Sequence, residues 1–237
     1  KIDQDHEETF FKDIPISILA LPKPGYEFVG WEGITDSNRI QYDCNSDGLF
    51  TAVFQLSDEL ILQDVFTENT VLEGYQSYVV QENITINPGV TLTISEGVKI
   101  SMPENGNIIV EGQLIINGTE QNPVEIFPHS SAQDNRWGAI CFNNATDSSS
   151  LYHLKLEGAS VGIDPSTHKG AISGLNSDIL ISHGEIENVF FPIYLEGGSL
   201  SINQSSISCD FVCDFINVKG GDAFIVGCTF FGSHAPD

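Results

Sequence analysis

The feature that most constrains the fold is a succession of very short β-rich runs, three or four residues each, from about residue 62 onward. Gly, Asn, Pro, Ser and Asp separate the runs, and these residues favour turns. We find no stretch of twelve residues with apolar side chains at the i, i+3, i+4 and i+7 positions of an amphipathic helix. The runs are shorter than an ordinary strand of about five or six residues. Examples are Tyr78-Val79-Val80, Ile84-Thr85-Ile86, Ile108-Ile109-Val110, Leu154-Lys155-Leu156 and Ile179-Leu180-Ile181.

Comparable runs return roughly every 20 residues, which is typical of a solenoid. Residues 90–94 (VTLTI) are followed by the similar 107–110 (NIIV), and 154–158 (LKLEG) by 193–197 (IYLEG). A single turn of such a coil cannot bury its own apolar face, but stacked turns bury a continuous apolar column. Alternation as in Leu154-x-Leu156 points one side chain inward and the next outward. The pattern predicts an all-β fold, a right-handed parallel β-helix, with a β-sandwich as the alternative.

The first part of the chain differs from this repetitive region. It contains strand-like segments at 14–21 and 49–54, and a boundary is expected near residues 56–58. We therefore predict a small β domain at 1–57 and the β-helix at 58–237. The polar opening Lys1–Asp5 resembles the start of a fragment cut from a longer protein. The final residues 234–237 form no evident cap, so we expect the β-helix to be truncated at its C-terminal end.

The charge balance limits the partners of the chain. Nine Lys and Arg face 33 Asp and Glu, a formal net charge of −24. Such a negative field disfavours nucleic acid and anionic membrane surfaces. No run of 18 apolar residues is present, so membrane insertion is not expected. The acidic, Lys-poor composition suits a secreted protein.

Five cysteines leave at least one outside any intrachain pair. Buried thiols, one disulfide and a metal site all remain open as their roles. Cys209 and Cys213 are four apart, and no His or second Cys pair gives the spacing of further zinc ligands. The others are Cys44, Cys141 and Cys228.

A first resemblance covers about 40 residues of the N-terminal part. Residues 20–33 read A-x-P and then G-Y-x-F-x-G-W-x-G, and residues 51–54 read T-A-x-F. This pattern resembles the InlB-type B-repeat of bacterial surface proteins. The resemblance implies a small β domain in which Trp31 occupies a core position.

A second resemblance covers the start of the repetitive region. Residues 80–100 read V-x-x-N-I-T-I-x-P-G-V-T-L-T-I-x-E-G-V-K-I, and similar runs continue to residue 126. The segment is similar to the first turns of β-helix regions in large secreted bacterial proteins. Many of those are Bacteroidetes surface proteins that also carry lamin-tail and CotH-like modules. No CotH kinase-like segment is present here, so none of that chemistry is implied.

The β-helix fold also hosts polysaccharide lyases and hydrolases, so candidate catalytic groups were weighed. Lyases of this shape use a basic residue, but the cations of this region lie in separate turns. His183-Gly184 matches part of a hydrolase pattern without its partners, and the remaining histidines, His153 among them, are scattered. Asp210, Asp214 and Asp222 are the carboxylates that could converge for glycoside chemistry. Trp137 is placed equally well in the core or at a groove edge. We predict no catalytic residues.

One local motif indicates a metal. Residues 43–48 read D-C-N-S-D-G, the first half of a calcium loop, in which alternate oxygens meet the ion. Asp43, Asn45 and Asp47 are therefore candidate calcium ligands. Phe54 stands where the last EF-hand ligand would be a Glu, so the motif is not an EF-hand.

Taken together, the sequence predicts a non-enzymatic structural or adhesive module of a large secreted or cell-surface bacterial protein, without a cofactor except calcium. Expected partners are extracellular glycans or other surface proteins, and self-association through the β-helix ends is also expected. The alternatives are a carbohydrate-active or glycan-binding β-helix and a filament-forming subunit.

Overall fold

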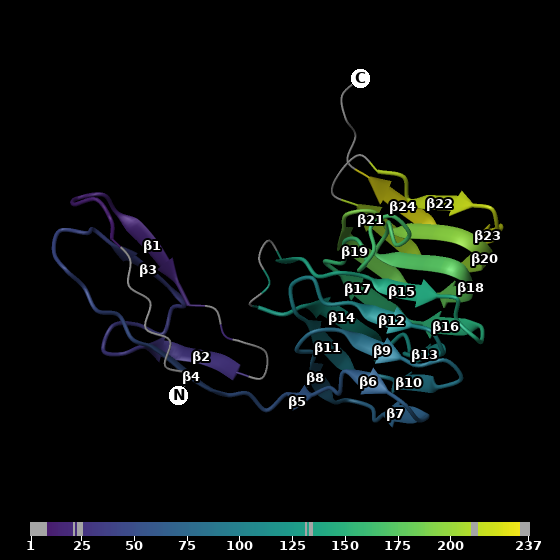
Figure 1. The fold of residues 1–237 in the computed structure, drawn as a ribbon, viewed down its shortest axis with the longest axis horizontal. Helices are drawn as coiled ribbons and strands as arrows, with labels where there is room; N and C mark the ends of the chain where they lie inside the picture. The colour runs from purple at the N-terminus through teal and green to yellow at the C-terminus, as the bar shows by residue number, and fades with distance from the viewer. Residues whose placement is uncertain are drawn as a thin grey trace, which may run out of the picture. The chain divides into compact units, whose positions relative to one another are not determined.

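The computed structural model describes residues 9–20, 22, 26–130, 132, 135–209 and 213–232. The chain divides into two compact units, Lys1–Asp58 and Glu59–Asp237, which Figure 1 shows in purple to blue and in blue to yellow. The sequence places this boundary after residue 57. Within the described residues, no helix has the length and apolar character needed to cross a membrane.

The first unit consists of two antiparallel strand pairs. β1 (Ile16–Leu19) pairs with β3 (Arg39–Tyr42), and β2 (Tyr26–Trp31) pairs with β4 (Ala52–Leu56). Its core is small and contains Ala20, Trp31 and Ile40, against which the rings of Phe28 and Phe50 pack. Trp31 is buried, so this indole is core and offers no face to a ligand. The B-repeat likeness of this unit remains a prediction.

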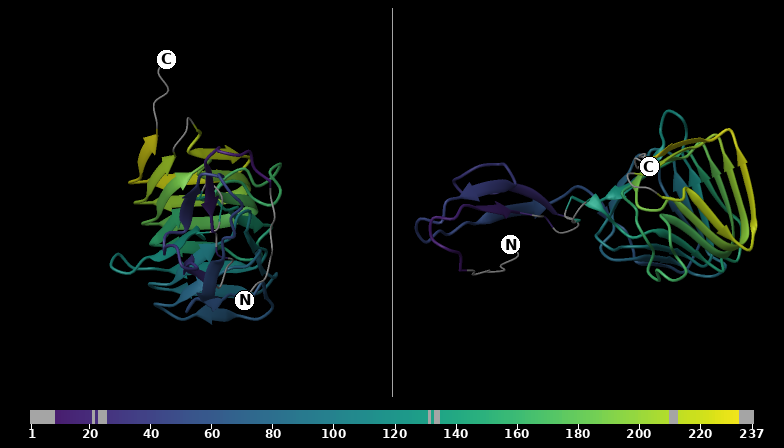
Figure 2. Two further views of the ribbon diagram at one scale, coloured as in Figure 1. Left: turned by 90° about the vertical axis from the view of Figure 1, so that its left-hand side faces the viewer. Right: turned by 90° about the horizontal axis from the view of Figure 1, so that it is seen from above.

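The second unit is a parallel β-helix, which confirms the predicted all-β fold class. Apart from the strands of the first and last described turns, each strand pairs in parallel with the strand one turn before it and the strand one turn after it. The turns stack upward in Figure 1 and superpose when viewed from above in Figure 2.

Three columns of strands form the β-helix. The first face contains β6 (Val65–Phe66), β9 (Ile84–Ile86), β12 (Ile108–Val110), β15 (Ile140–Asn143) and β22 (Ile216–Lys219). The second face contains β7 (Thr70–Leu72), β10 (Thr91–Ser95), β13 (Gln113–Asn117), β16 (Ser149–Tyr152) and β23 (Asp222–Val226). The third face contains β5 (Leu60–Ile61), β8 (Ser77–Val79), β11 (Lys99–Met102), β14 (Val124–Pro128), β17 (Leu154–Glu157), β19 (Glu185–Val189), β21 (Ser206–Cys209) and β24 (Thr229–Gly232).

Two strands are much longer than the three or four residues expected from the sequence. β18 (Ile172–Ser182) and β20 (Ile193–Asn203) each run through the first and the second face. They stay paired across the corner between these faces, where Ser177 aligns with Gly198. The backbone bends there at Asn176 and Gly197, which both have positive φ, without losing the ladder.

The register corrects the repeat alignment that the sequence suggests. Residues 154–158 and 193–197 lie on different faces, because Leu156 pairs with Ile186 and Ile193 pairs with Ile172. The same holds for residues 90–94 and 107–110, which belong to the second and the first face. All three strands of a turn have similar composition, so a likeness between two segments does not identify their register.

The core is a set of stacked apolar ladders. On the first face, five isoleucines occupy equivalent positions on consecutive turns, and each is at most 2 % exposed: Ile84, Ile108, Ile140, Ile172 and Ile193. Turns differ in length only outside these ladders. Two longer connections, residues 129–139 and 158–171, join consecutive turns between the third and the first face.

Replacing a residue in this ladder tests the core. Ile140→Ala removes apolar contacts with Ile108 and Ile172 above and below it, and we expect a loss of about 2–5 kcal/mol in the free energy of unfolding. Urea unfolding monitored by circular dichroism measures it. The matched change Val71→Ala, on an exposed outward position, should stay within about 0.5 kcal/mol. Equal losses in the two variants would contradict the ladder as the main source of stability.

Candidate functional site

Outward-facing side chains on the third face form a column of alternating charge. Lys99, Glu125, Lys155 and Glu185 occupy the same position on four consecutive turns, and we call them the charge ladder. Lys99 Nζ lies 3.2 Å from Glu125 Oε2, and Lys155 Nζ lies 2.8 Å from Glu185 Oε2. The hydrogen bond to Glu185 raises the pKa of Lys155. These pairs are partly exposed, so each contributes at most about 1 kcal/mol.

A second polar group lies on the outer side of the first face, on β20 and β22, beside the end of the 158–171 loop. It contains Lys169, Tyr194, Glu196 and Lys219, and we call it the outer cluster. Tyr194 Oη donates a hydrogen bond of 2.9 Å to Glu196 Oε2, and Lys219 Nζ donates one of 2.7 Å to Glu196 Oε1. Lys169 Nζ lies 5.1 Å from the centroid of the Tyr194 ring, within cation–π range.

Electrostatics in the outer cluster are set by two cations around one acid. The hydrogen bonds from Lys219 and then Tyr194 lower the pKa of Glu196, and the same contact with Glu196 raises the pKa of Lys219. Positive charge is scarce in this acidic chain, so two lysines beside one tyrosine form a distinctive surface. The two ammonium groups suit a hydroxyl-rich or carboxylate-bearing ligand, whereas the Tyr194 ring is buried and offers no face for stacking.

Histidines that look scattered in the sequence meet at a corner of the β-helix. The rings of His153 and His183 stack with their centroids 4.7 Å apart and their planes 20° from parallel. Both residues have positive φ, at 49° and 55°, at the turn between the second and the third face. The fold thus brings together two histidines that are scattered along the sequence. The two residues are 30 positions apart, and that spacing becomes a contact only once the length of this turn is known.

The 158–171 loop covers outward positions of the first face that would otherwise meet solvent. Cys141, Ser173 and Tyr194 occupy one outward column and are all buried. A Cβ on Gly162 would clash with Cys141 Sγ, which shows how closely the loop packs on this column. Burial raises the pKa of Cys141 to about 12, so this thiol stays protonated and unreactive.

His168 belongs to the same loop and is 5 % exposed. Its Nδ1 lies 3.2 Å from Thr167 Oγ1, whereas its buried Nε2 has no hydrogen-bond partner among the described residues. Burial lowers the pKa of His168, and the nearby Asp164 opposes this only in part. Burial also lowers the pKa of His129, the first residue of the other long connection.

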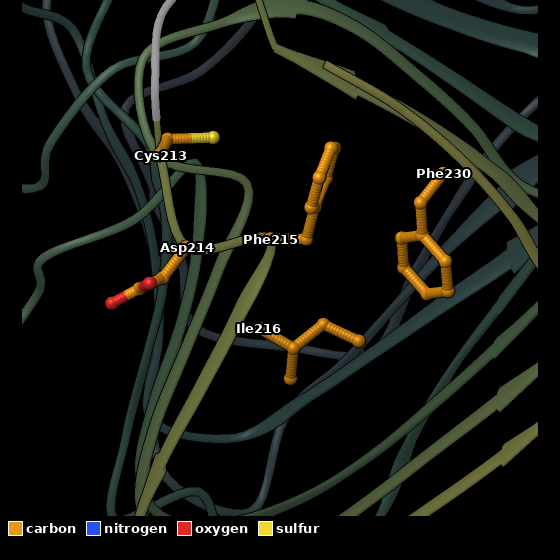
Figure 3. A pocket seen from close by; sticks show the side chains of 5 residues that line it. All are labelled: Cys213, Asp214, Phe215, Ile216 and Phe230. Carbon is orange, nitrogen blue, oxygen red and sulfur yellow. The ribbon is translucent and has the colours of Figure 1, made fainter. Parts of the chain in front are cut away.

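The three candidate carboxylates do not form a described pair. Asp210 lies outside the described residues. Asp214 and Asp222 belong to the same turn but lie on opposite sides of β22, before its first residue and after its last. Asp214 borders a hollow of about 440 Å³ at the last turn, with Cys213, Phe215, Ile216 and Phe230. In Figure 3 its carboxylate points away from the rings of Phe215 and Phe230, so the hollow has a polar side and an apolar side.

Trp137 is core rather than groove edge. Its side chain is 1 % exposed, and its Nε1 donates a hydrogen bond of 2.7 Å to the carbonyl oxygen of Glu157. With Trp31 also buried, neither indole offers a face for stacking on a sugar.

The candidate calcium ligands Asp43, Asn45 and Asp47 lie exposed between β3 and β4. Cys44 between them has positive φ and is buried, so the loop turns sharply there. No group of three or more His, Cys, Asp or Glu within the described ranges is arranged to hold a metal ion. Calcium also accepts amide and backbone carbonyl oxygens as ligands, so calcium binding at this loop stays a prediction.

Of the roles left open for the cysteines, the structure shows one disulfide, between Cys209 and Cys213. Cys44 and Cys141 are buried thiols, and Cys228 is a half-buried one. The disulfide closes the connection that enters the last turn.

Comparison with known proteins supports the β-helix. Residues 64–164, less than half of the chain, match the family model of the pectate-lyase like beta helix domain. This segment contributes strands to all three faces of the early turns. No curated protein and no solved structure matches the chain. The fold is therefore a parallel β-helix, part of which is similar to the pectate-lyase like beta helix domain, and no more specific function is shown.

The buried histidines predict a pH dependence. The folded pKa of His168 lies below its unfolded value of about 6.5, so its contribution to stability is complete above that pH and is lost as pH falls through the folded pKa. We expect urea unfolding to show lower stability at about pH 5.5 than at about pH 7.5. His168→Gln should weaken this dependence, and His129→Gln should weaken it independently. Identical pH profiles in the wild type and both variants would contradict the assignment.

Proposed function

We propose that this chain is a non-enzymatic module of a secreted or cell-surface bacterial protein, in which the β-helix is a rigid scaffold that supports adhesion. The observation that carries the proposal is the pairing of outward polar side chains with their equivalents on the next turn. The charge ladder does this on the third face, and the Lys219–Glu196 pair does it on the first.

Uncharged side chains follow the same rule. Asn107 donates two hydrogen bonds to Asn83 Oδ1, one turn earlier, from its backbone N at 2.8 Å and from its Nδ2 at 3.2 Å. Asn176 Nδ2 donates to Asn144 Oδ1 at 3.0 Å, and Ser199 Oγ donates to Asp178 Oδ1. Such contacts hold each turn to the next and leave few of these groups available for a reaction. They favour a stiff support over a reactive cleft.

A disulfide between Cys209 and Cys213 supports the extracellular location, because disulfides persist mainly in oxidising compartments. The high negative charge is consistent with a soluble surface that repels polyanions at long range. The bacterial origin, the B-repeat and the calcium loop belong to this proposal and rest on the sequence resemblances.

A second candidate function, glycan binding, is favoured by a different observation. The outer cluster places Lys169 and Lys219 at the first face. Residues 64–164, which do not include the cluster, match the pectate-lyase like beta helix domain. Fold likeness does not establish an activity. The cluster can still donate hydrogen bonds to sugar hydroxyl or carboxylate groups, so it is the surface on which we place an extracellular glycan partner.

A third part of the proposal concerns self-association. Inward positions of the last turn are partly exposed, namely Ile216, Val218, Ile225 and Phe230, and we call them the end surface. Among the described residues, no strand pairs with the outer edge of β22, β23 or β24. A second copy of the chain can satisfy this edge with its own strand groups.

A polysaccharide panel tests adhesion against catalysis. The full chain is incubated with neutral and acidic polysaccharides, and binding is measured together with the release of reducing ends and unsaturated products. We expect binding without bond cleavage. Cleavage of any polysaccharide would overturn the non-enzymatic proposal. Lys169→Ala with Lys219→Ala should weaken binding, whereas Lys155→Ala in the charge ladder is the matched control. Equal binding by both variants would remove the outer cluster as the glycan surface.

Light scattering over a range of protein concentrations tests the end surface. We expect the mean mass to rise with concentration for the wild type and to stay monomeric for Ile225→Asp, because a charge there cannot be buried against a second copy. Tyr152→Asp, an exposed position on β16 in the middle of the stack, is the control and should behave as the wild type. A wild-type mass that does not change with concentration would contradict self-association.

A further inference from the structure

We infer that His153 and His183 form a binding site for a divalent transition-metal ion such as Zn²⁺, at the corner between the second and the third face. The stacked rings carry the inference, because imidazole nitrogens are preferred ligands of zinc, nickel and copper.

The backbone holds the two residues in register. His153 N donates to the carbonyl oxygen of Ser182 at 2.9 Å, and His183 N donates to that of Asn203 at 3.0 Å. Two residues further along each strand, the Lys155–Glu185 ion pair joins the same two turns. The histidines therefore stay one inter-strand spacing apart, about 4.8 Å, whatever their side chains do.

One of the rings is oriented by a neighbouring hydroxyl. His183 Nδ1 lies 3.0 Å from Ser182 Oγ, and this contact leaves Nε2 as the nitrogen able to bind an ion. Metal-bound histidines commonly have their second nitrogen held in this way. Ser182 is thus a positioning residue for the site.

Geometry requires a modest change on binding. Two nitrogens on a tetrahedral zinc lie about 3.4 Å apart, closer than the 4.7 Å between the ring centroids. A metal also lies near the plane of each ring that binds it, so the rings must tilt out of their stack. His183 is exposed and His153 is half-buried, so both can turn. Water completes the coordination, which predicts an open and exchangeable site.

The surroundings favour a cation. The chain carries a net charge of −24, which attracts divalent ions to its surface. Most of that attraction belongs to carboxylates, which prefer hard ions such as Mg²⁺. A large excess of Mg²⁺ therefore occupies the carboxylates, and the Zn²⁺ binding that remains reports the histidine site.

Calorimetric titration of the full chain with Zn²⁺, in a large excess of Mg²⁺, tests the site. We expect one Zn²⁺ per chain and a higher melting temperature with Zn²⁺ than with EDTA. His153→Asn and His183→Asn should each weaken binding by about tenfold or more and remove the melting shift. Asn tolerates positive φ, so these variants keep the corner folded.

The matched control replaces the two histidines outside the described residues, His6→Asn with His234→Asn, and should bind as the wild type does. Ser182→Ala should weaken Zn²⁺ binding without lowering the melting temperature of the zinc-free protein. Absence of Zn²⁺ binding, or binding that both corner variants retain, would overturn the inference and leave the rings as a packing contact. Circular dichroism of each variant shows that the β-helix is intact.

Discussion

Every other feature of the β-helix depends on the parallel, in-register stacking of its turns. Backbone hydrogen bonds fix neighbouring strands about 4.8 Å apart, so each side chain has its equivalent directly above and below it. Inside, this places isoleucine on isoleucine from Ile84 to Ile193 and excludes water from the column. Outside, it sets lysine against glutamate and histidine against histidine. The core and the surface are consequences of one periodic constraint.

This constraint explains which parts of the fold the sequence predicts. Short runs such as Ile84-Thr85-Ile86 alternate inward and outward side chains, and that local pattern is enough to indicate a β-helix. Register is not local. The similar segments 154–158 and 193–197 belong to different faces, because turns of unequal length shift the alignment by an amount that no short motif records. The sequence does not predict the length of β18 and β20 for a related reason. The turn-forming residues at a corner that stays hydrogen-bonded are the same residue types that end a strand elsewhere.

The candidate sites also fall into two groups, those that a local motif predicts and those that depend on the length of the turns. Burial of Trp31 follows from its place in a local motif, whereas Trp137 could be placed only once the turn beside it was known. The outer cluster joins residues from the 158–171 loop and from two consecutive turns, and the histidine pair joins positions 30 apart. Both depend on turn length. Carboxylates such as Asp214 and Asp222 are near in sequence, but an intervening strand separates them, so proximity along the chain misleads in a solenoid.

The 158–171 loop leaves β17 and returns one turn later at β18, so its two ends are fixed by the stacking and not by its length. A segment inserted there changes neither the register of the strands nor the alignment of the ladders, because loop closure depends only weakly on the number of residues. The surface can therefore change at such a connection while the register of the strands stays the same. For protein engineering, the loop is a position at which a foreign peptide could be displayed on a support that does not need to be redesigned.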